Sequence, residues 1–347
     1  MDKAFRLKAH LFEHGIDISS CAKRILDAQS DIWLMDDYIT CSGVTLNFAD
    51  KYATVGAEQG SPYKLIEKSG GFVVTDGKDI YYDASVITPP DYMKDEIVIG
   101  GKRITEFVNT YTDRIRLQSM CGCANSCKFC NAQEYGYDFN NIKDLDEAFQ
   151  IALEQSNARH AFISTNNVKD ASGFKKLSNL IEYFAGKYPE MNLDLMTSPR
   201  GFNSYTDASQ YKPYLQHLKS VGIKGIAANL ELNNPDLLKH YCPEKALIGQ
   251  TKYLKFLEHS VDTFGQDNVR SLLIAGLEPL DETIAGVEKL AERGVNPVLS
   301  PLFPYGEAQG RTDAEFFIEA KERSDEICDK HKIKMGPVCE PCSHNTL

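Results

Sequence analysis

The sequence lacks the features that mark membrane, exported or low-complexity proteins. It contains no apolar run near the ~20 residues that span a bilayer. The opening segment, MDKAFRLKAHLFEHG, has no apolar stretch long enough for a signal peptide. No repeat or low-complexity tract is visible, and 42% hydrophobic with 25% charged residues is an ordinary globular balance for 347 residues. We therefore expect a cytoplasmic protein that does not associate with membranes.

Positive charge is also scarce. The chain has 38 Lys and Arg against 49 Asp and Glu, which gives a formal net charge of −11. Such a balance argues against a broad nucleic-acid-binding surface, so we expect no nucleic-acid partner. A glycine-rich phosphate loop and a Gly-x-Ser-x-Gly elbow are both missing.

Cysteine is the residue whose count is unusual. Ten cysteines amount to about 3% of the chain, below the density of small disulfide-stabilised scaffolds. In a reducing cytoplasm, clustered cysteines are metal ligands or catalytic groups more often than disulfides, although a disulfide interpretation of the cluster stays open. The ten stand at positions 21, 41, 121, 123, 127, 130, 242, 328, 339 and 342.

From about residue 112 the sequence repeats a short apolar strand, a loop and an amphipathic helix. Six such units in series predict an α/β fold with a parallel sheet and right-handed crossovers, closed into a partial (β/α)6 TIM-like barrel. An open doubly wound sheet is the alternative. We divide the chain into an N-terminal α+β extension (1–105), the barrel (106–310), and a C-terminal helix with a Cys-x2-Cys tail (311–347). The predicted strands are 114–120, 160–164, 193–197, 225–230, 269–275 and 295–299.

The loop after the first predicted strand contains Cys123-x3-Cys127-x2-Cys130. Three thiolates this close can hold one iron–sulfur cluster. Three ligands leave one iron of a four-iron cluster open to a substrate or cofactor. Zinc is the alternative, but structural zinc takes four ligands, and Cys121 is too close to Cys123 to chelate easily beside it.

This motif, at the end of the first barrel strand and with Phe129 before the last cysteine, resembles the radical S-adenosylmethionine (radical SAM) superfamily over about residues 110–310. The resemblance implies that Cys123, Cys127 and Cys130 hold a [4Fe–4S] cluster whose open iron binds S-adenosylmethionine (SAM). Reductive cleavage of SAM would give a 5′-deoxyadenosyl radical, which abstracts hydrogen from a small-molecule or carrier-bound substrate. A flavodoxin or ferredoxin-type protein would supply the electron, and the enzyme would be a transferase or an oxidoreductase.

The resemblance also implies SAM-binding positions near the strand ends. Phe129 would lie near the adenine, although a core aromatic is the structural alternative. Glu231 is the best candidate to meet the ribose or the amino group of SAM, and Asn229 is second. A carboxylate at a barrel mouth without a partner would be costly. No residue is assigned as catalytic acid or base.

Three further positions match the family pattern less closely. Ser164 ends the second strand, where the family often has a Gly-Gly-Glu-like turn; a helix N-cap is the alternative there. Arg200, after the third strand, would pair with a carboxylate of cofactor or substrate, or else lie on the surface. Gly276, after the fifth strand, would allow close approach of a flat ligand.

The tail carries a second pair, Cys339-x2-Cys342, with His344 as a further ligand. Resemblance to radical SAM enzymes with an auxiliary iron–sulfur cluster makes such a second site the first hypothesis. Sulfur insertion, as in lipoyl and biotin synthases, would then join rearrangement and dehydrogenation as candidate reactions. A zinc ion, an idle tail or a redox dithiol are the alternatives for the tail. For the whole chain, the alternative is a non-catalytic iron–sulfur electron carrier or assembly scaffold.

Overall fold

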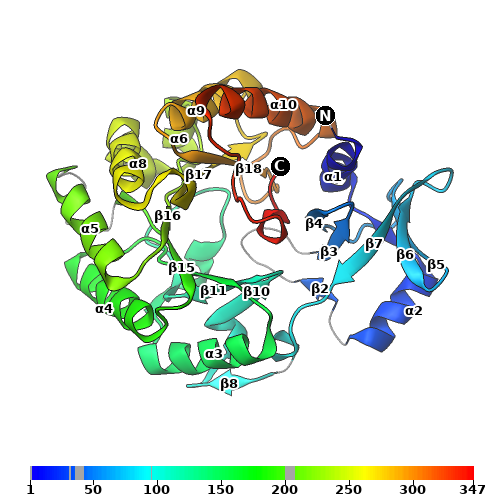
Figure 1. Cartoon of the computed structure of the whole chain (residues 1–347), viewed down its shortest axis with the longest axis horizontal. Coiled ribbons are helices and arrows are strands. Elements are labelled where there is room, and N and C mark those ends of the chain that lie inside the picture. The colour runs from blue at the N-terminus through cyan, green and yellow to red at the C-terminus, as the bar shows by residue number, and fades with distance from the viewer. Residues whose placement is uncertain (1, 31–32, 36–42, 95, 200–207) are drawn as a thin grey trace.

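A computed structural model describes residues 2–30, 33–35, 43–94, 96–199 and 208–347. The elements form a ring in which two sheets face each other across the centre (Figure 1). One sheet is the barrel sheet, and the other belongs to the N-terminal part of the chain. No helix in the described ranges combines the length and apolar character needed to cross a membrane.

The barrel sheet has the strand order β10-β11-β14-β15-β16-β17-β18. The antiparallel edge strand β10 precedes six strands that pair in parallel. The sheet is curled and its helices lie outside the curve (Figure 1), whereas a doubly wound sheet has helices on both faces. The predicted partial barrel is therefore confirmed. Its strands are β10 (Val108–Tyr111), β11 (Arg114–Gln118), β14 (His160–Ser164), β15 (Asn192–Met196), β16 (Gly225–Ala227), β17 (Val269–Ala275) and β18 (Asn296–Pro301).

Amphipathic helices cover the outside of this sheet. In α3 (Ile142–Gln155) the side chain of Asn141 caps the first turn by accepting from Lys143 N at 2.8 Å. Leu145, Phe149 and Ala152 lie on one face and are buried against the strands. The other helices are α4 (Ala171–Lys187), α5 (Tyr211–Val221), α6 (Pro235–Tyr241), α7 (Pro243–Ile248), α8 (Gln250–Phe264), α9 (Leu280–Ala291) and α10 (Ala314–His331).

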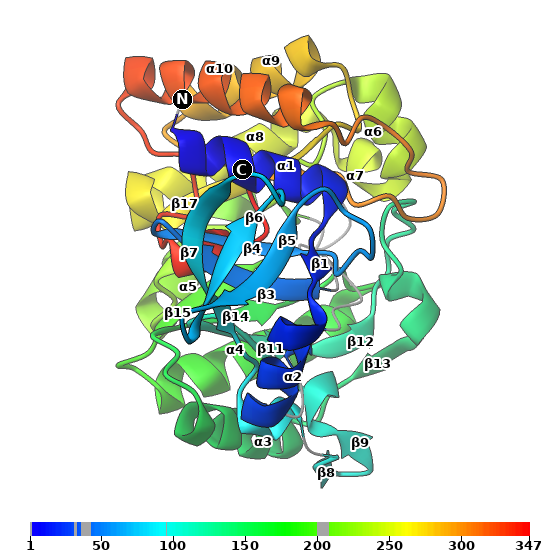
Figure 2. The same cartoon turned by 90° about the vertical axis from the view of Figure 1, so that its right-hand side faces the viewer.

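The N-terminal part has its own sheet and apolar core. The strand order is β1-β5-β6-β7-β3-β2, with β4 beside β3, and the core includes Leu11, Leu46 and Val55. The helix α1 (Lys3–His14) lies beside α10 of the barrel (Figure 2). The remaining elements are α2 (Ser20–Gln29), β1 (Asp17–Ile18), β2 (Leu34–Met35), β3 (Gly43–Phe48), β4 (Lys51–Val55), β5 (Lys64–Lys68), β6 (Gly71–Thr75) and β7 (Ile80–Ile87). The short strands β8 (Val98–Ile99) and β9 (Lys102–Arg103) connect this part to the barrel.

The segment after α10 returns to the inside of the ring and joins the two sheets (Figure 1). Leu347 N donates to Leu299 O of β18 at 2.8 Å, and Thr54 N of β4 donates to His344 O at 2.7 Å. Thr112 Oγ1, in the turn between β10 and β11, donates to Pro341 O at 2.7 Å. The tail thereby lies across the amino-terminal end of the barrel, opposite the end at which the loops follow the strands.

Candidate functional site

A cavity of about 320 Å³ lies inside the curve of the barrel sheet. The three motif cysteines line it at the carboxyl ends of the strands, which is where barrel active sites form. Cys342 and Thr346 of the tail line the same cavity. The cavity is therefore bounded by the cysteine loop at one end and by the tail at the other.

A small hairpin positions the cysteine loop. The strands β12 (Met120–Gly122) and β13 (Tyr137–Phe139) pair antiparallel, and the loop between them carries the motif. Gly122 has φ +69°, and a Cβ there would lie 1.5 Å from Gly136 O. Only glycine satisfies both the left-handed backbone and this close approach. Asn166 Nδ2 donates to Gly122 O at 2.7 Å, which ties the hairpin to the end of β14.

The backbone around the motif directs N–H groups at two of the sulfurs. Asn125 N lies 3.4 Å from Cys123 Sγ, and Ala132 N lies 3.4 Å from Cys130 Sγ. Burial raises the pKa of Cys123, and it raises the pKa of Cys130 to about 11. These thiols hold their protons at neutral pH, so a bound metal would release protons as it forms bonds to sulfur.

The spacing of the three thiols fits a cluster better than a single ion. Among the described residues, the motif cysteines do not form a group whose ligand atoms all lie within 4.8 Å of one another. In a cluster each thiolate bonds a different iron, so the sulfurs stand further apart than the ligands of one ion. Cys121 and Cys242 do not line the cavity, so the cysteine loop contributes only its three motif thiols, while Cys342 faces the cavity from the tail at the other end. The donor set fits a [4Fe–4S] cluster with one iron open.

Beside the cysteine loop lies a buried ion pair. Lys245 Nζ of α7 donates to Glu231 Oε1 at 2.6 Å and to Asn229 O at 2.8 Å. Glu231 is 8% exposed and has φ +69°, an uncommon conformation for a residue other than glycine. Burial alone lowers the pKa of Lys245, but Glu231 and nearby Tyr253 outweigh it and raise that pKa well above its usual value. The lysine stays charged, and the pair presents a fixed carboxylate to the cavity.

The structure brings some of the predicted cofactor residues together and places others elsewhere. Phe129, Asn229 and Glu231 line the cavity together with the motif cysteines. At the end of β14, Asn166 and Asn167 line the cavity. Ser164 is fully buried and is not among the lining residues. At this strand end the asparagines that follow Ser164, and not Ser164 itself, face the site.

Two further predicted positions lie away from the cavity or outside the described residues. Gly276 is not among the lining residues; its carbonyl accepts from Arg311 N at 2.9 Å. A Cβ on Gly276 would lie 1.9 Å from Arg311 O, so the chain itself makes the close approach that we expected of a ligand. Arg200 lies outside the residues that the structure describes.

Arginines inside the barrel were missed by the sequence analysis. Arg114, Arg116 and Arg270 line the cavity. Arg114 lies 4.8 Å from the centre of the Phe162 ring, and Arg270 Nη1 contacts Asp194 Oδ2 at 2.6 Å. Arg114 and Arg116 are two residues apart on one strand, so their side chains share a face. The alternation of arginines along this predicted strand could have indicated that both side chains point into the barrel.

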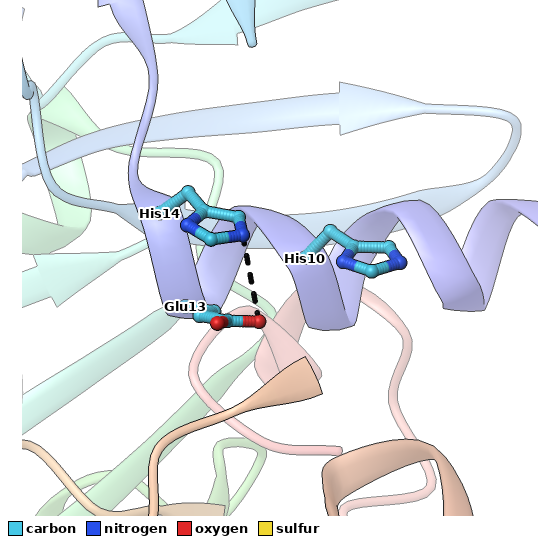
Figure 3. A group of neighbouring side chains, drawn as sticks. All are labelled: His10, Glu13 and His14. Atoms are coloured by element: carbon cyan, nitrogen blue, oxygen red, sulfur yellow. Dashed lines mark ion pairs between the residues drawn. The ribbon is translucent and has the colours of Figure 1, made fainter. Parts of the chain in front are cut away.

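A second overlooked group lies on α1, where His10 and His14 have the His-x3-His spacing that puts both rings on one helix face. Ligand atoms of His10, Glu13 and His14 lie within 4.8 Å of one another. Figure 3 shows Glu13 beneath His14, at 3.5 Å between Oε2 and Nε2. Glu13 Oε2 also accepts from Ala314 N at 2.8 Å, at the start of α10. The carboxylate therefore already serves the contact between the two helices.

Known proteins similar to this chain were sought in three ways, and no family model matches. Bacteriochlorophyllide c C-7(1)-hydroxylase of Chlorobaculum limnaeum is 26% identical over 250 residues, covering 63% of this chain and 61% of that protein. The solved structure of Streptococcus suis SuiB bound to the precursor peptide SuiA matches with a TM-score of 0.50 and 11% identity, covering 68% of this chain and 51% of that one. A radical SAM methyltransferase from Sphaerobacter thermophilus matches with a TM-score of 0.45 and 15% identity, covering 79% and 76%.

In this chain Cys123, Cys127 and Cys130 line the cavity in the loop that follows the first parallel strand of the barrel. The chain is similar to radical SAM enzymes. The radical SAM enzymes among its structural neighbours bind a [4Fe–4S] cluster and SAM. The match spans about three fifths of the curated relative's length, so the activity of the whole protein is taken up below as a proposal.

Proposed function

We propose that this chain is a radical SAM enzyme whose cluster is held by Cys123, Cys127 and Cys130. The observation that carries the proposal is the placement of three motif thiols on one cavity at the carboxyl ends of the barrel strands. When bound with SAM, a [4Fe–4S] cluster takes up one electron and supplies methionine and a 5′-deoxyadenosyl radical, which takes a hydrogen atom from the substrate to give 5′-deoxyadenosine. A flavodoxin or ferredoxin-type donor would supply the electron.

The residues beside the cysteine loop would orient SAM. Glu231 is fixed by Lys245 through one oxygen and lines the cavity, so its carboxylate can accept from the amino group or a ribose hydroxyl. Asn229 lies next to it, and Phe129 offers a ring face to the adenine. Asn166 and Asn167 supply amide groups from the neighbouring strand end.

The cavity wall beyond the cysteine loop points to an acidic substrate. Arg114, Arg116 and Arg270 bring three guanidinium groups to the inside of the barrel, and Arg270 donates to the carboxylate of Asp194. Buried guanidinium groups stabilise carboxylate or phosphate through charge-assisted hydrogen bonds. We infer a small-molecule or carrier-bound substrate with an anionic group directed toward these arginines and its reacting carbon toward SAM.

This lining favours catalysis over the alternative of a non-catalytic electron carrier or scaffold. A carrier exchanges electrons through its surface and has no use for a cavity with charged walls inside a barrel. The curated relative is named a hydroxylase, which is an oxidation at carbon. We therefore favour an oxidoreductase that begins with hydrogen abstraction, ahead of sulfur insertion, which would also require a second source of sulfur.

The test is anaerobic reconstitution with iron and sulfide, followed by dithionite and SAM. We expect about four irons at this site and formation of 5′-deoxyadenosine together with methionine. If the cluster is intact but no 5′-deoxyadenosine forms, the proposal of a radical SAM enzyme is wrong. The alternative of an iron–sulfur electron carrier would then be favoured. Replacing Cys123, Cys127 and Cys130 together by Ala is the matched control, because those chains cannot hold the cluster.

A further inference from the structure

A second cluster of ligand-type side chains lies at the opposite end of the barrel from the cysteine motif. Asp113 precedes β11, and His160 is the first residue of β14. The tail brings Cys339 and Cys342 against them. Ligand atoms of Asp113, His160 and Cys339 all lie within 4.8 Å of one another. Cys342 Sγ lies 3.1 Å from Asp113 Oδ1.

From these contacts we propose that Cys339, Cys342, His160 and Asp113 bind a single zinc ion. This site is separate from the proposed cluster and does not depend on it. Two thiolates, an imidazole and a carboxylate are the ligand types of four-coordinate zinc. Of the alternatives for the tail, this proposal chooses a single metal ion. Its ligands include His160 and Asp113, and they do not include His344.

The distances support one ion. Cys339 Sγ lies 3.4 Å from Asp113 Oδ1, and His160 Nε2 lies 3.8 Å from Asp113 Oδ2. A tetrahedral ion with bonds of about 2.0–2.3 Å places its ligand atoms about 3.3–3.8 Å apart. Thiolates on a four-iron cluster stand further apart because each bonds a different iron.

The other described cysteines lie in other parts of the molecule, which also argues against an auxiliary cluster at the tail. Cys121 lies near Lys102 and Asp138. Cys242 lies beside Cys127, Cys328 lies on α10 near Asp325, and Cys21 is exposed on α2. An auxiliary cluster at the tail would have only two cysteines from the described residues, whereas zinc can use the compact group of Asp113, His160 and Cys339 together with Cys342, which contacts Asp113.

Neighbouring side chains hold the four ligands in place. The Asn192 amide lies 3.0 Å from His160 Nδ1, which orients the ring and leaves Nε2 toward Asp113. Arg159 binds Asp113 Oδ2 at 2.5 Å and lies 4.0 Å from Cys339 Sγ. Zinc with two thiolates and a carboxylate carries one net negative charge, which this guanidinium offsets.

The tail is also anchored on both sides of Cys342, so this thiol is held in a fixed place. Lys8 Nζ donates to Ser343 O at 2.8 Å, and Thr112 Oγ1 donates to Pro341 O at 2.7 Å. Because Cys342 lines the cavity as well, an ion here would hold the tail in place across the amino-terminal end of the barrel. We assign the site a structural role: it joins the tail to the first two parallel strands.

The test is the metal content of the full chain, purified from medium containing zinc, before any iron is added. We expect about one zinc per chain in the wild type and in the control Cys328→Ser. We expect loss of that zinc when Cys339 and Cys342 are replaced by Ser, and its retention in the His10→Ala, His14→Ala double variant, which removes the histidine pair on α1. X-ray absorption of the wild-type zinc should show two sulfur and two nitrogen or oxygen ligands.

Three results would overturn the proposal. One is wild-type protein without zinc. Another is an iron content of about eight per chain after reconstitution that falls to about four when the tail cysteines are replaced. That result would establish an auxiliary cluster. The third is a chain whose mass shows a Cys339–Cys342 disulfide. Because the absorption measurement uses the wild type, the proposal can fail even if the cysteine variants do not fold.

Discussion

Lys245 Nζ lies 2.6 Å from Glu231 Oε1, and both side chains are about nine-tenths buried. Lys245 comes from α7 and Glu231 from the loop after β16, and both side chains line the cavity. Removing one partner leaves an uncompensated charge in a poorly solvated place, whereas removing both does not.

We therefore predict that Lys245→Met lowers the free energy of unfolding by about 3–5 kcal/mol. The double variant Lys245→Met, Glu231→Gln should recover most of that loss, because neither residue then carries a charge. Urea unfolding of the two single variants and the double variant measures the coupling. Additive losses in the double variant would show that the pair does not act as a unit.

The two neighbouring thiols Cys127 and Cys242 give a sharp test of ligand assignment. They lie close enough for a hydrogen bond, which lowers the pKa of Cys127, but only Cys127 lines the cavity. We predict that Cys127→Ala loses the reconstituted cluster and that Cys242→Ala keeps about four irons per chain. Iron and sulfide analysis decides it, and loss of iron in Cys242→Ala alone would reverse the assignment.

Gly122 tests whether the hairpin shapes the cluster loop. We predict that Gly122→Ala loses at least half of the reconstituted iron, because its Cβ would meet Gly136 O at 1.5 Å. Gly136→Ala is the matched control: Gly136 also has a positive φ of 77°, but a Cβ there meets nothing within 4 Å. Equal iron loss in both variants would attribute the effect to backbone strain rather than to the close approach.

His344 makes the stability of the fold depend on pH. Burial, with the positive charges of Arg114 and Lys8, lowers its pKa to about 3, while its Nδ1 lies 2.7 Å from Thr54 Oγ1. The unfolded chain takes up this proton near pH 6.5 and the folded chain only near pH 3, so the unfolded state binds more protons in between. Stability contributed by His344 is thus present above about pH 6.5 and falls by about 1.4 kcal/mol for each pH unit below it.

The measurement is urea unfolding of the wild type and His344→Gln at pH 7 and pH 5. The wild type should lose about 2 kcal/mol more than the variant over that interval. His217→Gln is the control, since His217 is exposed and pairs with Glu182. Identical pH dependence in the wild type and His344→Gln would show that this histidine does not contribute.

Much of the barrel could be predicted because its signals are local. Apolar runs of five to seven residues, each followed by an amphipathic helix, predicted the six parallel strands, and 160–164 and 269–275 match β14 and β17 residue for residue. The cysteine spacing was likewise readable, since its ligands lie within eight residues. Ser164 and Gly276 show the limit of this approach: a position at a strand end does not say which way its side chain or backbone faces.

By itself, the sequence determined the strand–helix order and the motif of Cys123, Cys127 and Cys130, because hydrophobic periodicity and ligand spacing act between near neighbours. Only the tertiary structure decided that Lys245 pairs with Glu231, that three arginines face inward, and that the tail meets β18 and β4. It also brought Cys339 to Asp113, a residue 226 positions earlier. The physical reason is that these contacts depend on how the ring closes, and the pattern of any one segment carries no record of the distant segment against which it packs.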